Sequence, residues 1–186
     1  MNQQTIVILN LGGRYRDTIA RRVRELSVYS EILPVETHAE KIRKMNPIGI
    51  ILAGGGKSIQ DSDIVFPEKS LYKSGIPILG IGLGAQLMAA QLGGTVIPSD
   101  LPASVAGIHV DASSPLFSNL DEAQPVCFDH MARIEKLPDG FRSIASMQDL
   151  SAVAFENEAA KLYGTQFFLE AEETVAGKRM LERFLF

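Results

Sequence analysis

The sequence is poor in several residue types, and their scarcity narrows what this chain can be. It has one cysteine, three histidines and no tryptophan among 186 residues. A lone Cys127 cannot close a disulfide within the chain, and it cannot supply a cysteine-based zinc site. The sequence therefore predicts a reducing compartment and no structural metal.

An excess of positive charge is also missing. The chain carries 18 Lys and Arg against 22 Asp and Glu, a formal net charge of −4. Nucleic acids and anionic membrane surfaces attract proteins that present a broad basic field. Neither is expected as a partner.

Long apolar runs and a targeting pattern are absent as well. No apolar stretch approaches the roughly 20 residues of a membrane-spanning helix. The first residues, Met1 to Gln4, lack the basic and then apolar order of a signal peptide. The sequence thus predicts a cytoplasmic protein, and the length favours a single domain over residues 1–186.

The first half of the chain alternates strand and helix patterns. Thr5 to Leu11 is a continuous apolar run closed by two glycines, as in a strand buried on both faces of a parallel sheet, and we expect it to be the central strand. Strands alternating with helices at these lengths indicate right-handed βαβ units. Further strands are expected at Ser30 to Leu33, Gly49 to Ala53 and Ile76 to Ile81, and helices at 19–26, 38–44 and 85–92.

The second half has short strand patterns separated by turns that contain proline and glycine. These candidates are Ile108 to Val110, Val126 to Phe128, Ser143 to Ala145, Ala152 to Phe155 and Tyr163 to Phe167. A final helix is expected at Val175 to Phe184. Together the two halves predict an α/β fold: a doubly wound, mainly parallel central sheet with flanking helices and a small antiparallel β addition.

Several motifs follow one another in a family-specific order. Residues 19–26 read Ile-Ala-Arg-Arg-Val-Arg-Glu-Leu, 49–55 read Gly-Ile-Ile-Leu-Ala-Gly-Gly, and 86–94 read Gln-Leu-Met-Ala-Ala-Gln-Leu-Gly-Gly. Leu-Pro-Asp-Gly-Phe follows at 137–141. In this order and spacing the chain resembles, over almost its full length, the glutaminase domain of GMP synthetases, a class I glutamine amidotransferase.

The resemblance fails at the positions that carry the chemistry. The family's strand-to-helix elbow reads Gly-Ile-Cys-Tyr-Gly-Met-Gln, whereas residues 80–86 read Gly-Ile-Gly-Leu-Gly-Ala-Gln. The nucleophile position is therefore Gly82, which has no atom that could form a thioester. The family's Gln-Phe-His-Pro-Glu is Gln-Phe-Phe-Leu-Glu here, so Phe168 replaces the histidine base and Glu170 remains as the triad acid. The resemblance thus predicts that glutaminase activity is absent.

Segments that hold glutamine in the family are also altered. Its Arg-Glu-Tyr-Gly aligns with residues 101–104, and its Ser-His-Gly-Asp aligns with residues 129–132, where only the histidine is retained. Backbone amides that stabilise an oxyanion can survive side-chain replacement. The resemblance leaves these oxyanion or ligand-binding candidates: Gly54, Gly55, Leu83, Gln86 and His130.

Three roles follow from this pattern. The first is a catalytically inactive domain retained as a partner-binding or regulatory module, because the framework is kept while the chemistry is lost. In the family the partner is an ATP pyrophosphatase-type synthetase domain or subunit, no cofactor is implied, and a homo-oligomer is also compatible with the sequence. The second role is a small-molecule site in the reshaped cleft. The third is a residual hydrolase that uses a displaced nucleophile, Cys127 or Ser58.

Overall fold

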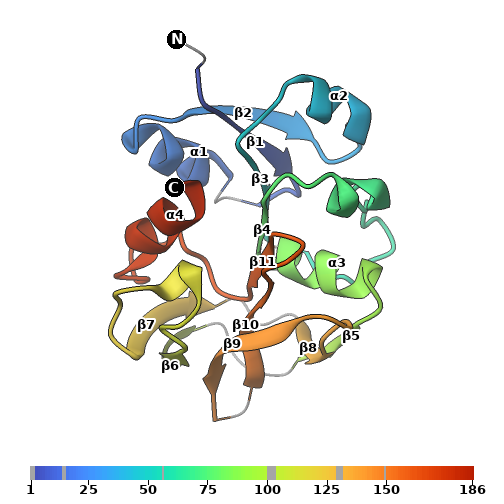
Figure 1. Cartoon of the computed structure of the whole chain (residues 1–186). Coiled ribbons are helices and arrows are strands. Elements are labelled where there is room, and N and C mark those ends of the chain that lie inside the picture. Colours follow the sequence, from blue (N-terminus) through green and yellow to red (C-terminus); the bar gives the residue numbers. More distant parts are fainter. Residues whose placement is uncertain (1–2, 14–15, 56, 100–103, 129–131, 149) are drawn as a thin grey trace.

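The computed structural model of this chain describes residues 3–13, 16–55, 57–99, 104–128, 132–148 and 150–186. One mixed nine-stranded sheet runs through the molecule in the order β2-β1-β3-β4-β11-β10-β9-β6-β7, and a second sheet pairs β5 with β8 (Figure 1). The strands are β1 Thr5–Asn10, β2 Tyr29–Pro34, β3 Gly49–Ala53, β4 Ile78–Ile81, β5 Thr95–Pro98, β6 Ser104–Val110, β7 Ala123–Phe128, β8 Ala132–Lys136, β9 Arg142–Met147, β10 Leu150–Asn157 and β11 Leu162–Thr165. The helices are α1 Arg16–Glu25, α2 Ala39–Lys44, α3 Leu83–Gln91 and α4 Gly177–Leu185, with 3₁₀ turns η1 Lys69–Lys73 and η2 Pro115–Phe117.

The parallel half of the sheet is sandwiched between two pairs of helices. β1, β2, β3, β4 and β11 are parallel, and every residue of β3 and β4 is buried. α1 and α4 share one apolar core, while α2 and α3 share the other (Figure 1). Strands covered on both faces need apolar residues at every position, which explains the continuous apolar runs. The predicted doubly wound α/β architecture is confirmed.

The antiparallel strands extend this same sheet. β11 pairs with β4 in parallel and with β10 in antiparallel, and β9, β6 and β7 continue outward from β10. The prediction that the apolar run Thr5 to Leu11 forms the central strand is wrong, because β1 lies second from the edge, between β2 and β3. The added strands shift the middle of the sheet to β11. The sequence patterns also missed β5 and β8, whose short, partly exposed runs lack a clear alternation.

None of the described helices is long and apolar enough to cross a bilayer. The longest of them, α1, has 10 residues, whereas a span needs about 20. Within the same described ranges, no three His, Cys, Asp or Glu side chains are grouped so that they could hold a metal ion.

The close approach of α3 to β3 yields a stability prediction. A Cβ atom placed on Gly84 would lie 2.2 Å from the carbonyl oxygen of Leu52, so Gly84→Ala must push the helix off the sheet. We expect a loss of about 2 kcal/mol or more in the free energy of unfolding, measured in urea. Gly107→Ala is the matched control, because nothing lies within 4 Å of its added atom. Equal stability of the two variants would contradict this packing.

Candidate functional site

A sharp turn joins β4 to α3 at Gly82, the position that aligns with the family's nucleophile. Gly82 has φ 59° and ψ −115°, a conformation that side-chain-bearing residues rarely adopt. Its N–H donates to the carbonyl oxygen of Thr165 at 2.8 Å, and its own carbonyl accepts from the N–H of Ala85 at 3.1 Å. The strand, turn and helix of the predicted elbow are therefore present, and the residue at the apex has no side chain.

The ring of Phe168 occupies the space above this turn. A Cβ atom placed on Gly82 would lie 2.9 Å from Phe168 Cε1, and one placed on Gly55 would lie 3.1 Å from Phe168 Cζ. The backbone of Phe168 is fixed on both sides: its N–H donates to the Cys127 carbonyl at 2.9 Å, and its carbonyl accepts from Thr174 Oγ1 at 2.6 Å. Phe168 is 4% exposed. Its ring thus fills the volume into which a side chain at the apex would project.

The next residue, Leu169, is buried as well. Two large apolar side chains therefore replace the His-Pro pair of the family motif within the core. A small molecule would have to displace the Phe168 ring to reach Gly82. This packing argues against a ligand directly above the elbow.

The predicted oxyanion positions meet at the elbow, but their backbone N–H groups differ in whether they already donate a hydrogen bond. The carbonyl oxygen of Gly54 would lie 3.3 Å from a Cβ atom on Gly82, which places this turn beside the apex. The N–H of Gly55 donates to the carbonyl of Gly12 at 3.3 Å and is already engaged. Leu83 is the first residue of α3, where N–H groups have no acceptor within the helix.

A small cavity of about 200 Å³ lies next to Leu83, at the carboxyl end of β1, and is also lined by Val35 after β2 and by the loop that follows β3. The strand order reverses there, and α/β proteins commonly bind ligands at such points. Lys57 is the cation on its wall, but its Nζ pairs with Asp63 Oδ2 at 2.5 Å. This hydrogen bond also holds the pKa of Asp63 below its usual value. Asp63 therefore neutralises Lys57 within the same loop, which weakens the case for an anion-binding site in this cavity.

Glu170 is buried without a partner among the described residues. It is 1% exposed, and neither carboxylate oxygen has a hydrogen bond there. Desolvation by burial raises its pKa to about 8, so the carboxyl group is mostly protonated at neutral pH. Phe168, which replaces the family's histidine, offers no proton for it to accept. The remaining member of the predicted triad has no group to orient.

Two buried glutamines tie the small sheet to the main one. Gln86, a predicted ligand contact, donates from Nε2 to the carbonyl of Ala132 at 2.9 Å and so anchors α3 to β8. Gln166 accepts from the N–H of Ile134 at 3.2 Å and donates to the carbonyl of Ala152. No sequence pattern indicates this role of Gln166, because its partners lie 14 and 32 residues away.

Of the remaining predicted residues, Cys127 lies beside the elbow, because its backbone carbonyl accepts from the N–H of Phe168. His130 lies outside the described residues. Ser58 is buried in the loop after β3, and Cys127 is half-buried in β7. The two described histidines, His38 and His109, are exposed and each lies 3.7 Å from a glutamate. Neither of them is placed as a base for a displaced nucleophile.

The contact between Gly82 and Phe168 predicts energetic coupling. Gly82→Ala should destabilise the protein both through its positive φ and through the contact with the ring. In a Phe168→Ala background only the backbone cost remains, so the loss should shrink by at least about 0.5 kcal/mol. Gly12→Ala is the control, since its φ is 88° and nothing lies within 4 Å of the added atom. Urea unfolding of wild type, the two single variants and the double variant measures the coupling, and purely additive losses would disprove the contact.

The raised pKa of Glu170 predicts a pH-dependent effect of Glu170→Gln. From about pH 4.3 to about pH 8 the unfolded chain releases the proton while the folded protein keeps it, so the wild type loses stability as pH rises. The variant lacks this penalty. Its stability relative to wild type should increase by up to roughly 1.4 kcal/mol per pH unit in this window. Exposed Glu172→Gln is the control, and parallel pH curves for wild type and Glu170→Gln would refute the burial argument.

Comparisons with known proteins place this geometry in a family. Residues 7–186 match the family Glutamine amidotransferase class-I. The chain is 41% identical to a GMP synthase (glutamine-hydrolyzing) of Clostridium botulinum and 39% identical to one of Acetivibrio thermocellus. Both alignments cover all of this chain but only 37% of the relative.

Solved structures agree with the sequence relatives. A protein from Thermoplasma acidophilum, described as belonging to a GMP synthase, has a TM-score of 0.86 at 27% identity, covering 100% of this chain and 94% of that one. A glutamine amidotransferase of Thermotoga maritima, at 20% identity, shares the fold with a TM-score of 0.71, and the match covers 100% of this chain and 82% of that one. The architecture is thus that of a GMP synthase-like glutaminase domain, and the chain belongs to the class I glutamine amidotransferase family.

Proposed function

We propose that this chain is a glutamine amidotransferase-like domain that does not hydrolyse glutamine and that acts as a partner-binding or regulatory module. The observation that carries the proposal is the apex of the elbow, where Gly82 supplies no nucleophile and the ring of Phe168 fills the space above it. The family framework is otherwise kept from β1 to α4.

Glutamine hydrolysis through an acyl-enzyme needs an attacking atom and a base that takes its proton. Gly82 and Phe168 provide neither. Hydrolases that lose such groups keep a residual rate from binding and oxyanion stabilisation, but only when the substrate still reaches the site. Here the Gly55 amide is engaged by Gly12 and the ring stands in the path of the carboxamide. Even this residual route is closed in the proposal.

The proposed partner is an ATP pyrophosphatase-type synthetase. The curated relatives are GMP synthases, and this chain spans 37% of their length. In those proteins the amidotransferase region accompanies a much larger remainder. A domain that keeps the fold while it lacks the catalytic groups can still occupy its place beside a synthetase and alter how that enzyme works.

An ammonia-release assay with glutamine tests the loss of activity. Wild type and Cys127→Ala should both give the no-enzyme rate, with the Clostridium botulinum GMP synthase as the positive control. A rate in the wild type that thiol alkylation or Cys127→Ala abolishes would instead support a displaced nucleophile. A covalent glutamyl adduct detected by mass spectrometry would sink the proposal outright.

Size-exclusion chromatography with a separately purified synthetase of this type tests the partner. We expect the two proteins to co-elute, and we expect the ammonia-dependent amination of xanthosine monophosphate to change while glutamine supports none. Separate elution at micromolar concentrations, together with an unchanged ammonia-dependent rate, would remove the partner from the proposal.

A further inference from the structure

A second cavity, of about 330 Å³, lies at the amino ends of the parallel strands β4 and β11, whereas the elbow lies at their carboxyl ends. Pro77 and Lys161, which directly precede β4 and β11, lie on its wall. Because these two strands are parallel, Gly82 and Phe168 follow their other ends. The size is within the range of pockets that hold small molecules. This cavity is therefore separate from the amidotransferase site.

Aromatic rings form much of the apolar wall. Tyr163 of β11 and Phe184 of α4 meet edge to face, with ring centroids 6.2 Å apart. Leu116 of η2 and Phe186 add apolar surface, and Phe186 is 70% exposed. Aromatic rings favour offset-stacked or edge-to-face contacts with further rings. The wall is suited to a flat, aromatic ligand.

Two cations stand on the same wall. Lys161 and Arg183 both line the cavity, and Glu158 contributes the one carboxylate side chain among the lining residues. In the described part of the chain neither cationic side chain has a hydrogen bond or an ion pair, unlike Arg21 and Arg22, which both pair with Glu25. An arginine fork and a lysine ammonium together suit a carboxylate or similar anion.

The backbone holds Lys161 in an unusual conformation. Its φ is 57°, which a long side chain adopts at a cost of about 1 kcal/mol. The N–H of Lys161 donates to the carbonyl of Glu158 at 3.1 Å, and its carbonyl accepts from the N–H of Ile78 at 3.0 Å. These bonds fix the turn that brings Lys161 to the cavity wall.

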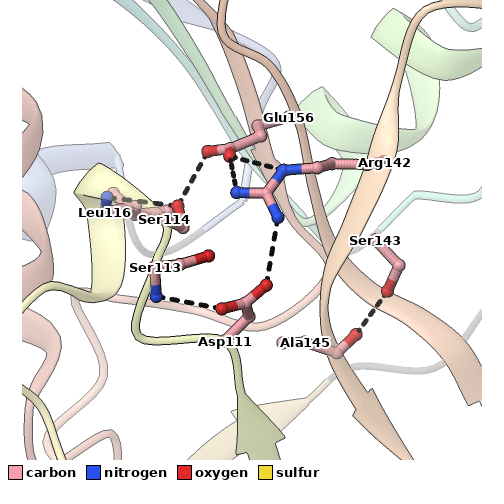
Figure 2. A network of polar contacts seen from close by, with 8 residues as sticks. All are labelled: Asp111, Ser113, Ser114, Leu116, Arg142, Ser143, Ala145 and Glu156. Atoms are coloured by element: carbon pink, nitrogen blue, oxygen red, sulfur yellow. Dashed lines mark hydrogen bonds and ion pairs between the residues drawn. The ribbon is translucent and has the colours of Figure 1, made fainter.

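A partly buried polar network holds η2, which contributes Leu116 to the cavity wall (Figure 2). Ser114 caps η2 by accepting from the N–H of Leu116, and its hydroxyl donates to Glu156 Oε2 at 2.7 Å. Glu156 Oε1 accepts from Arg142 Nε and Nη2 at 3.0 and 2.6 Å, and Arg142 Nη1 reaches Asp111 Oδ2 at 3.0 Å. The network thereby locks η2, which supplies Leu116, onto β10 and β9.

We propose that this cavity binds a planar aromatic molecule that bears one carboxylate or comparable anionic group. The ring lies against Tyr163 and Phe184, and the anion lies between Lys161 and Arg183. The site is independent of the proposed loss of glutaminase activity, because no residue of the elbow takes part in it.

Indole-3-acetate is a suitable probe, since the chain has no tryptophan and the indole fluorescence of the ligand is read without background. Fluorescence anisotropy should show saturable binding. Lys161→Asn, which tolerates a positive φ, and Arg183→Met should each weaken it about tenfold. Lys178→Met is the matched control, because Lys178 is an exposed cation on the same helix as Arg183 and does not line the cavity. Indole alone should bind more weakly and equally to all variants.

Several outcomes would overturn the proposal: no saturable binding at millimolar ligand, unchanged affinity in both cavity variants, or an equal loss in Lys178→Met, which would indicate a general charge effect. Circular dichroism checks that each variant is folded. If a variant is not folded, the ring-proton resonances of Tyr163 and Phe184 in the wild type decide the matter. Shifts concentrated on these rings support the site, and shifts elsewhere refute it.

Discussion

The packing of the Phe168 ring against the glycine turn at position 82 is the constraint on which the rest of this site depends. The ring fits because the apex has no Cβ atom, and the apex can keep its φ of 59° because it is glycine. A cysteine at position 82 would bring its Cβ atom within 2.9 Å of the Phe168 ring, so it could not be accommodated without moving that ring. Gly82 and Phe168 are therefore physically linked, and the turn keeps its shape with no side chain at its apex.

The elbow persists because the fold itself needs it. β4 must turn sharply into α3, whose first residues pack so closely on β3 that Gly84 nearly touches the Leu52 carbonyl. Gln86 then ties the helix to β8. These contacts are structural, and they hold whether or not a nucleophile is present. The fold of the elbow therefore does not by itself establish function.

Two buried glutamates, Glu156 and Glu170, differ in whether their carboxylates have hydrogen-bond partners. Glu156 accepts hydrogen bonds from Ser114 and Arg142, so its charge is fully compensated (Figure 2). Glu170 has no partner among the described residues, and burial raises its pKa to about 8. The first holds η2 to the sheet, whereas the second costs stability at neutral pH. Glu170 gains no polar partner from Phe168, because the phenylalanine side chain has neither a charge nor a hydrogen-bonding group.

The sequence by itself determined the parallel half of the fold and the elbow with a glycine at its apex, because apolar runs, glycine positions and residue identities are local properties. Only the tertiary structure decided that Phe168 fills the apex, that Gly12 engages the Gly55 amide, and that β1 lies near the edge of the sheet. The cavity shared by Lys161 and Arg183 belongs to this second group. Such features arise from contacts between distant segments, for which a local pattern carries no signal.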